Sequence, residues 1–330
     1  MKAVILPGPG GPDVLTLSEV EAPAIRADRD LLIRLKAAGL NPLDTKLRGR
    51  GTYGEDDPAI LGCDGAGVVE EAGDACSRFR PGDEVYFFNG GIGAGAGNYA
   101  EYAVVDERWV AAKPRALSFP EAAAVPLAVI TAWESLFDRG GLRSGERALI
   151  HSGAGGVGHL AVQLAADAGA AVCTTVGSPE KAELARMLGA QHAIPYREED
   201  FAEAARAWSG GNGVDLAFDT VGPGVLEATF PAVRFFGRAV TLLDPSGIAF
   251  KQARLRNLSI TLELMLTPMY FGLTQARTHQ TQILEYVARM IDDGRLRVHL
   301  SRTFPLAQAA EAHRLLEDGH LTGKLALTID

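Results

Sequence analysis

The chain has 330 residues, of which 47% are hydrophobic and 22% are charged, and its formal net charge is −9. This length favours two domains with separate cores over a single core. The negative charge argues against general binding of nucleic acids or anionic membranes, because their phosphates would repel it.

The first third of the chain is predicted to be rich in β-strands, because short apolar runs are separated by Gly, Pro and Asp. These runs lie at 3–6, 31–35, 67–70, 84–88 and 102–105. The glycine-rich stretch 89–98 is predicted to be a short loop.

From residue 119 the pattern changes to strands that alternate with helices, which is typical of an α/β fold with a doubly wound parallel sheet. The predicted strands lie at 147–151, 171–176, 192–195, 214–218, 237–243 and 258–262. The predicted helices lie at 120–139, 157–168, 179–188, 199–208 and 223–235. The C-terminal part adds helices at 279–292 and 306–317 and strands at 300–304 and 324–329.

A glycine motif joins the strand at 147–151 to the helix that follows it. Gly153, Gly155 and Gly158 have the spacing of the dinucleotide fingerprint. The helix is predicted to begin near Gly156 and Val157, so that its unpaired N–H groups and its positive dipole end face a pyrophosphate. Because a strand precedes this motif and a second strand closes the βαβ unit, the sequence predicts a Rossmann cofactor site.

The chain as a whole resembles the medium-chain dehydrogenase/reductase superfamily, and within it the zinc-free quinone oxidoreductase (zeta-crystallin-like) branch. The blocks 37–44, 61–67 and 79–85, the glycine motif and Gly323-Lys324 carry this resemblance. It implies a Rossmann domain at 124–265, inserted in a β-rich GroES-like catalytic domain made of 1–123 and 266–330. It also implies a homodimer joined through the Rossmann sheets, and the apolar strand at 258–262 would offer the exposed edge for that pairing.

The metal-binding positions of the superfamily depart from the zinc pattern. Its zinc alcohol dehydrogenases place a Cys near 41, a His-Glu pair near 63–64 and a third ligand near 127, where this chain has Asn41, Cys63-Asp64 and Leu127. A catalytic zinc needs three protein ligands and one open position, so we expect no metal. Without a Lewis acid, the chemistry shifts from unactivated alcohols to quinones and to C=C bonds conjugated to a carbonyl.

The choice of nicotinamide cofactor depends on the segment after the second Rossmann strand. NAD sites usually place an acid there, on the ribose 2′-OH, whereas this segment ends the strand without one and continues as Ser178-Pro-Glu-Lys181. Lys181 falls in the first turn of a helix, where a cation is unfavourable unless an anion lies nearby. A 2′-phosphate would be such an anion, although a solvated surface lysine is the alternative. Tyr196 matches a tyrosine that closes the same phosphate pocket in quinone reductases, so we expect NADPH.

Around the nicotinamide, the resemblance implies roles for Asn41, Asp44 and Tyr53 as the catalytic set. Asn41 would contact the cofactor near the nicotinamide ribose, and Tyr53 would donate a hydrogen bond to the acceptor oxygen. For Asp44, a structural role as the acceptor of a backbone N–H is an equally weighted alternative. Thr131 is a further candidate for lining the cofactor site, and His151 is expected to be a packed polar residue. Four further histidines are expected on the surface or in packing roles: His279, His299, His313 and His320.

The leading hypothesis is an NADPH-dependent, zinc-independent oxidoreductase that transfers hydride to a quinone or an α,β-unsaturated carbonyl. One alternative is an enoyl-thioester reductase of the same superfamily, and another is a nucleotide-binding protein with an RNA-binding or structural role. Three scattered cysteines, no signal-peptide pattern and no apolar run of membrane-spanning length lead us to expect a cytoplasmic protein. Acceptor specificity is expected to lie in the loops 45–60, 86–98 and 244–275.

Overall fold

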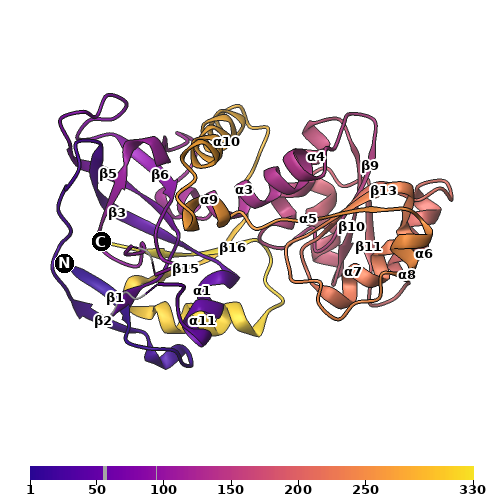
Figure 1. Cartoon of the computed structure of the whole chain (residues 1–330), viewed down its shortest axis with the longest axis horizontal. Coiled ribbons are helices and arrows are strands. Elements are labelled where there is room, and N and C mark those ends of the chain that lie inside the picture. The colour runs from indigo at the N-terminus through magenta and orange to yellow at the C-terminus, as the bar shows by residue number, and fades with distance from the viewer. Residues whose placement is uncertain (55–57, 94) are drawn as a thin grey trace. The chain divides into compact units, whose positions relative to one another are not determined.

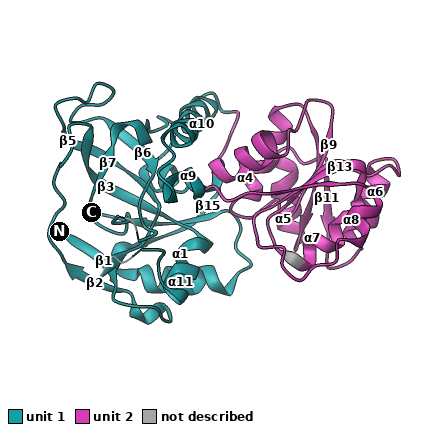
Figure 2. Cartoon of the chain, viewed as in Figure 1, with its two compact units in different colours: residues 1–128, 266–294, 298–330 teal, residues 129–265, 295–297 magenta. Residues whose placement is uncertain are grey.

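The computed structural model describes residues 1–54, 58–93 and 95–330, which divide into two compact units (Figures 1 and 2). Unit 1 contains residues 1–128, 266–294 and 298–330, and unit 2 contains residues 129–265 and 295–297. Residues 55–57 and 94, which belong to two of the predicted specificity loops, lie outside the described residues. Within the described ranges, no helix is long and apolar enough to cross a membrane.

Unit 1 is built on a seven-stranded sheet around the long strand β3 (Asp30–Leu40). β3 is antiparallel to β5 along most of its length, to β7 at one end and to β16 at the other. A smaller sheet has the order β2-β1-β4. The other strands of the unit are β1 (Lys2–Leu6), β2 (Thr16–Glu19), β4 (Ala59–Ile60), β5 (Asp64–Ala72), β6 (Glu84–Phe88), β7 (Tyr102–Asp106), β8 (Val110–Ala112), β15 (Leu300–Pro305) and β16 (Lys324–Thr328).

The helices of unit 1 follow or connect these strands. α1 (Pro42–Arg50) begins directly after β3, and Asn41 is its N-cap. The others are α2 (Phe119–Ala123), α9 (Thr267–Tyr270), α10 (Thr274–Asp292) and α11 (Ala309–Asp318), with the 3₁₀ turns η1 (Pro12–Val14), η2 (Glu107–Trp109) and η5 (Leu306–Gln308). α3 (Pro126–Trp133) contains the boundary between the two units.

Unit 2 is a doubly wound sheet of six parallel strands in the order β11-β10-β9-β12-β13-β14. This is the strand order of a Rossmann fold. The strands are β9 (Arg147–Ile150), β10 (Ala171–Val176), β11 (His192–Pro195), β12 (Val214–Asp219), β13 (Val233–Thr241) and β14 (Ser259–Leu262). The helices are α4 (Gly158–Asp167), α5 (Pro179–Met187), α6 (Phe201–Trp208), α7 (Pro223–Thr229) and α8 (Lys251–Leu255), with the π-helix η3 (Glu134–Arg139) and the 3₁₀ turn η4 (Phe230–Ala232).

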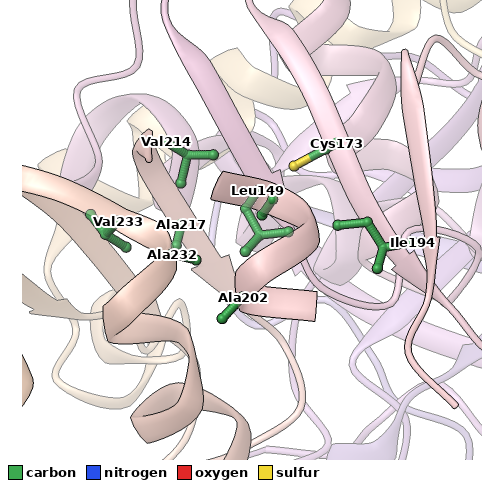
Figure 3. Close-up of a cluster of buried hydrophobic side chains, with 9 residues drawn as sticks. Leu149, Cys173, Ile194, Ala202, Val214, Ala217, Ala232 and Val233 are labelled. Carbon is green, nitrogen blue, oxygen red and sulfur yellow. The ribbon is translucent and has the colours of Figure 1, made fainter. Parts of the chain in front are cut away.

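The core of unit 2 lies between the sheet and the helices on its faces. Strands buried on both faces are rich in small and β-branched residues, and β10 reads Ala-Val-Cys-Thr-Thr-Val. Figure 3 shows one cluster of this core, in which Leu149, Cys173 and Ile194 come from three neighbouring strands and Ala202 comes from α6. The apolar packing fixes the register of the strands, and with it the turns at their carboxyl ends.

The predicted alternation of strands and helices is confirmed, but several predicted bounds are wrong. The helix expected at 279–292 begins at Thr274, and the strand expected at 237–243 is Val233–Thr241. The helix expected at 120–139 is divided, because Pro126 lacks an N–H and disfavours helical geometry at the residue before it. The helix expected at 223–235 ends at Thr229, since Pro231 breaks it and β13 already begins at Val233. α1 was not predicted, because its sequence Pro-Leu-Asp-Thr-Lys-Leu-Arg-Gly-Arg has no apolar periodicity.

Candidate functional site

The glycine turn of unit 2 connects β9 to α4 and packs tightly against the next strand. A Cβ at Gly153 would overlap the Thr174 side chain, and a Cβ at Gly158 would overlap the backbone carbonyl of Ser152. A Cβ at Gly155 would meet only Ser152, mainly its side chain. The first and third glycines are therefore required by close packing, whereas the second leaves the outer side of the turn accessible to a ligand. α4 begins at Gly158, one to two residues later than expected, with Val157 as its N-cap.

Buried hydroxyl groups hold this turn in place. Ser152 has a positive φ of 55°, which is uncommon for a residue with a side chain. Its backbone N–H donates to Thr175 Oγ1 at 3.0 Å, and the Gly153 N–H donates to the Thr175 carbonyl at 3.2 Å. His151 is buried against Thr229, with 2.8 Å between Nε2 and Oγ1, and burial lowers the pKa of His151 to about 3. His151 is thus a neutral packed residue, as the sequence predicted.

A cluster of hydroxyl groups and cations lies at the carboxyl ends of β10 and β11. Ser178 is the N-cap of α5, and its Oγ accepts the Lys181 backbone N–H at 3.3 Å. The Tyr196 side chain lies beside Gly177: a Cβ added to Gly177 would lie 3.2 Å from the Tyr196 hydroxyl oxygen. Arg197 extends over the Tyr196 ring at 5.8 Å. Ser178 and Lys181 thus lie at the start of α5 after β10, Tyr196 follows the adjacent strand β11, and Arg197 adds a cation that was not predicted.

These features fit a nicotinamide dinucleotide. The glycine turn leaves room for a pyrophosphate beside the N-terminus of α4. The N–H groups of His159, Leu160 and Ala161 already donate to the Gly155 and Val157 carbonyls, so the N–H groups of residues 156–158 are the ones that a phosphate would bind. At the end of β10 the chain offers Gly177 and Ser178 where NAD sites place a carboxylate. Thr131, the remaining cofactor candidate of unit 2, is buried in α3.

In unit 1 a buried polar network contains the residues at the zinc-ligand positions of the superfamily. Asn41 Nδ2 donates to Asp64 Oδ2 at 2.9 Å, and the Leu127 backbone N–H donates to Asp64 Oδ1 at 2.8 Å. Lys324, on β16, donates from Nζ to Asn41 Oδ1 and to the Leu40 carbonyl, the latter at 2.8 Å. Asn41, Asp64 and Lys324 are all buried. These positions are therefore joined to each other by hydrogen bonds around a buried ammonium group.

Asp44 lies in the first turn of α1 and extends this network. Its Oδ2 accepts the Asn41 backbone N–H at 2.8 Å and the Tyr99 hydroxyl at 3.0 Å. The alternative role of Asp44, as the acceptor of a backbone N–H, thus corresponds to an observed hydrogen bond. Tyr99 in turn contacts His313 Nε2 at 3.2 Å, and Arg48 Nη1 lies 3.3 Å from His313 Nδ1.

Arg48 fixes which groups donate and which accept in this series of hydrogen bonds. A guanidinium group only donates, so His313 Nδ1 accepts from Arg48 and Nε2 carries the hydrogen. His313 then donates to the Tyr99 oxygen, and Tyr99 donates to Asp44 Oδ2. Burial, with a contribution from Arg48, lowers the pKa of His313 to about 3, which agrees with a neutral ring. His313 has the packing role expected for it, within a network that the sequence did not reveal.

Burial dominates the electrostatics of this network. It raises the pKa of Asp44 to about 7, with a further contribution from the charge of Asp64, and it raises the pKa of Asp64 to about 6. Burial also lowers the pKa of Lys324, while Asp64 and Asp44 oppose that shift. Asp44 Oδ1 has no hydrogen-bond partner. Cys63 is fully buried, and burial raises the pKa of its thiol well above the usual value, as expected for a small inert residue.

Tyr53 is exposed and lies among other aromatic side chains of unit 1. Its hydroxyl oxygen accepts a hydrogen bond from Arg50 Nη2 at 2.5 Å, and its ring meets that of Tyr270 edge-on, with the centroids 5.4 Å apart. Because Arg50 donates to the oxygen, the hydroxyl hydrogen of Tyr53 can be donated to a ligand.

Among the residues described, no group of three or more His, Cys, Asp and Glu side chains is arranged to hold a metal ion. At the three superfamily positions, Asn41 and Asp64 form the network above and Leu127 contributes a backbone N–H. The sequence signals for this network were slight: an acid after Cys63, and a lysine in the Gly323-Lys324 pair near the last strand.

Comparisons with known proteins agree with this architecture. The model of the alcohol dehydrogenase GroES-like domain matches residues 27–115, and that of a zinc-binding dehydrogenase matches residues 188–327. A quinone oxidoreductase of Pseudomonas aeruginosa is 34% identical over 320 residues, which cover 96% of each chain. A chloroplastic NADPH-dependent alkenal/one oxidoreductase of Arabidopsis thaliana is 33% identical and covers 99% of this chain and 79% of its own. The structure of Escherichia coli quinone oxidoreductase complexed with NADPH superimposes with a TM-score of 0.87 at 28% identity over both full lengths.

Proposed function

This chain belongs to the medium-chain dehydrogenase/reductase superfamily, in its quinone oxidoreductase branch, and from that premise we propose that it is an NADPH-dependent, zinc-independent reductase of quinones or α,β-unsaturated carbonyls. The segments after β10 and β11 carry the proposal, because β10 ends without the acid of NAD sites, Lys181 lies in the first turn of α5, and Arg197 and Tyr196 follow β11. The Glu180 carboxylate of the same turn is hydrogen-bonded to Ser178. When bound, the nicotinamide supplies the hydride that the acceptor receives.

The residues of unit 2 bind and orient the cofactor in this proposal. The turn from Gly153 to Gly158 and the N-terminus of α4 hold the pyrophosphate. Lys181 and Arg197 neutralise the 2′-phosphate, and Tyr196 offers it a hydroxyl donor. In the cofactor-free protein the Ser178 hydroxyl donates to the Glu180 carboxylate, a hydrogen bond that lowers the pKa of Glu180. The names of the Arabidopsis enzyme and of the Escherichia coli complex, both of which mention NADPH, support this choice.

Zinc independence is supported by the buried network of unit 1. The Lys324 ammonium group already lies between Asn41 and the Leu40 carbonyl. A divalent ion at these positions would be repelled by the ammonium charge and would have to compete for the oxygens it occupies. Leu127 has no side-chain donor atom to complete a ligand set.

Tyr53 and Asn41 act on the reactants in this proposal. Tyr53, polarised by the Arg50 guanidinium, donates its hydrogen bond to the acceptor oxygen, where negative charge develops as the acceptor is reduced. Asn41 donates from its amide to the cofactor near the nicotinamide ribose. Asp44 orients Asn41 through the backbone N–H that it accepts.

The test is a turnover panel of quinones, enals, enoyl thioesters and simple alcohols, measured with NADPH and with NADH, together with elemental analysis of the purified protein. We expect turnover of a quinone or an enone with a preference for NADPH, and no stoichiometric zinc. Oxidation of simple alcohols that is lost together with bound zinc on chelation would overturn the zinc-independent assignment. A marked preference for enoyl thioesters would instead favour the alternative reductase.

A further inference from the structure

Lys324 is a buried cation whose position depends on residues from distant parts of the chain. Its ammonium group contacts the Asn41 amide oxygen and the Leu40 carbonyl at the end of β3, and β16 brings it there by pairing with β3. The same Asn41 amide donates to Asp64, the first residue of β5. Asn41 is thus held between a buried cation and a buried carboxylate.

The donor and acceptor chemistry permits one orientation of the Asn41 amide. An ammonium group only donates, so the atom that faces Lys324 must be Oδ1. An ionised carboxylate only accepts, so the atom that faces Asp64 must be Nδ2. Rotating the amide by half a turn would place its NH₂ group against the ammonium and its oxygen against the carboxylate, and both contacts are repulsive. Nδ2 carries two hydrogens, and Asp64 takes one of them.

We propose that Lys324 is a positioning residue for Asn41, which fixes the amide with Oδ1 towards the ammonium group and Nδ2 towards Asp64. This inference rests on the proposed function, in which the Asn41 amide contacts the cofactor. Lys324 thereby acts through Asn41 and contacts neither reactant.

Lys113 provides a matched control in the same unit. Its side chain is 5% exposed, and its ammonium group donates to the carbonyls of Pro114 and Leu117 at 3.0 and 2.6 Å. It also pairs with Glu84 at 3.1 Å. Lys113→Met therefore removes a comparably buried lysine with two backbone acceptors, but leaves the Asn41 amide unchanged.

The first experiment is a double-mutant cycle on the dissociation constant for NADPH, measured by fluorescence titration without an acceptor. Asn41→Ala and Lys324→Met should each weaken binding about three- to ten-fold, the effect of losing one hydrogen bond. The double variant should be no weaker than the weaker single variant, because the two changes remove the same contact. If the effects multiply to about ten- to a hundred-fold, or if Lys113→Met weakens binding as much, the proposal is wrong.

The second experiment observes the amide directly in the cofactor-free protein. With ¹⁵N-labelled asparagine, the Asn41 side-chain signals, identified by their absence in Asn41→Ala, should exchange slowly with solvent in the wild type and in Lys113→Met. They should exchange faster in Lys324→Met. Unchanged exchange in that variant would overturn the proposal.

Lys324→Gln keeps a donor for Asn41 Oδ1 and removes the charge, so it should retain most of the NADPH affinity and the slow exchange. If Lys324→Met does not fold, this variant still decides, since a fast-exchanging amide in Lys324→Gln would contradict orientation by hydrogen bonding. A wild-type protein that binds NADPH but reduces no quinone or enone would overturn the proposed function alone. Additive effects in an active enzyme would overturn this inference alone.

Discussion

Replacing Asp44 with Asn is expected to stabilise the cofactor-free protein at neutral and alkaline pH. Asp44 Oδ2 accepts two hydrogen bonds, from the Asn41 N–H and the Tyr99 hydroxyl, whereas Oδ1 has no partner. The proton of the neutral acid therefore belongs on Oδ1. An Asn side chain can place its oxygen at Oδ2 and its NH₂ group at Oδ1, so the variant mimics the protonated acid at every pH.

The magnitude follows from the pKa of Asp44, which burial raises from 3.8 to about 7. Between these values the folded protein holds the proton and the unfolded chain does not, so the free energy of unfolding falls as the pH rises. The fall is about 1.4 kcal/mol per pH unit, which gives about 4 kcal/mol over the whole interval. Asp44→Asn removes this loss. The difference in stability in favour of the variant should therefore grow from about pH 4 to pH 7 and then become constant.

Urea unfolding between pH 5 and 8.5 measures this difference. Trp109 lies in unit 1 with Asp44, whereas Trp133 and Trp208 lie in unit 2, so a background with Phe at positions 133 and 208 makes fluorescence report on unit 1. Asp74→Asn, at an exposed carboxylate of the same unit, is the control and should leave the pH profile unchanged. The reasoning fails if the difference between Asp44→Asn and the wild type does not depend on pH. It also fails if the wild type gains stability relative to the variant as the pH rises, because Asp44 would then be an ionised and well-paired carboxylate.

Three further predictions test the site and the assembly. Lys181→Ala should lower kcat/KM for NADPH about five- to thirty-fold, which corresponds to about 1–2 kcal/mol for one partly screened charge-assisted contact. The kcat/KM value for NADH should not change, and an equal loss for both cofactors would contradict a role of Lys181 in binding the 2′-phosphate. Tyr53→Phe should lower kcat roughly a hundred-fold at an unchanged dissociation constant for NADPH, measured by stopped-flow and titration, and an unaltered kcat would remove Tyr53 from the reaction. We predict a homodimer paired through the edge strand β14, so Ile260→Pro should shift light scattering towards the monomer, whereas a monomeric wild type at micromolar concentration would refute the pairing.

The Rossmann unit could be predicted from the sequence because its signals are local. Strands and helices alternate at regular spacing, and the glycine turn between β9 and α4 has its required residues within six positions. The start of α5 is local in the same way, because Ser178 caps the helix and Pro179 follows it directly. The predicted helices that contain Pro126 and Pro231 were too long, because apolar periodicity continues past each proline whereas the helix does not.

The buried network of unit 1 could not be predicted in this way. Residues 41, 64, 99, 313 and 324 come together only when β3, β5, β16 and α11 are assembled, and buried polar residues follow no period along the chain. α1 was missed because its side chains are mostly polar, although its Arg48 is buried and orients His313. Such contacts depend on tertiary register, which a strand or helix pattern does not encode.

The pairing of β16 with β3 has a consequence for the order in which the protein is made. The ribosome releases residues 1–128 before unit 2. Residues 37–39 of β3 can then pair with β5 on one side, but the other side of residues 37–40 finds its partner only in residues 325–328. Until then one edge of the sheet is open, and Asp44 and Asp64 lack the lysine that balances their charge. Unit 2 is nearly continuous in sequence, so it can fold during synthesis. Unit 1 keeps an unpaired strand edge until β16 has been synthesised. We therefore expect aggregation and chaperone binding mainly in this nascent state.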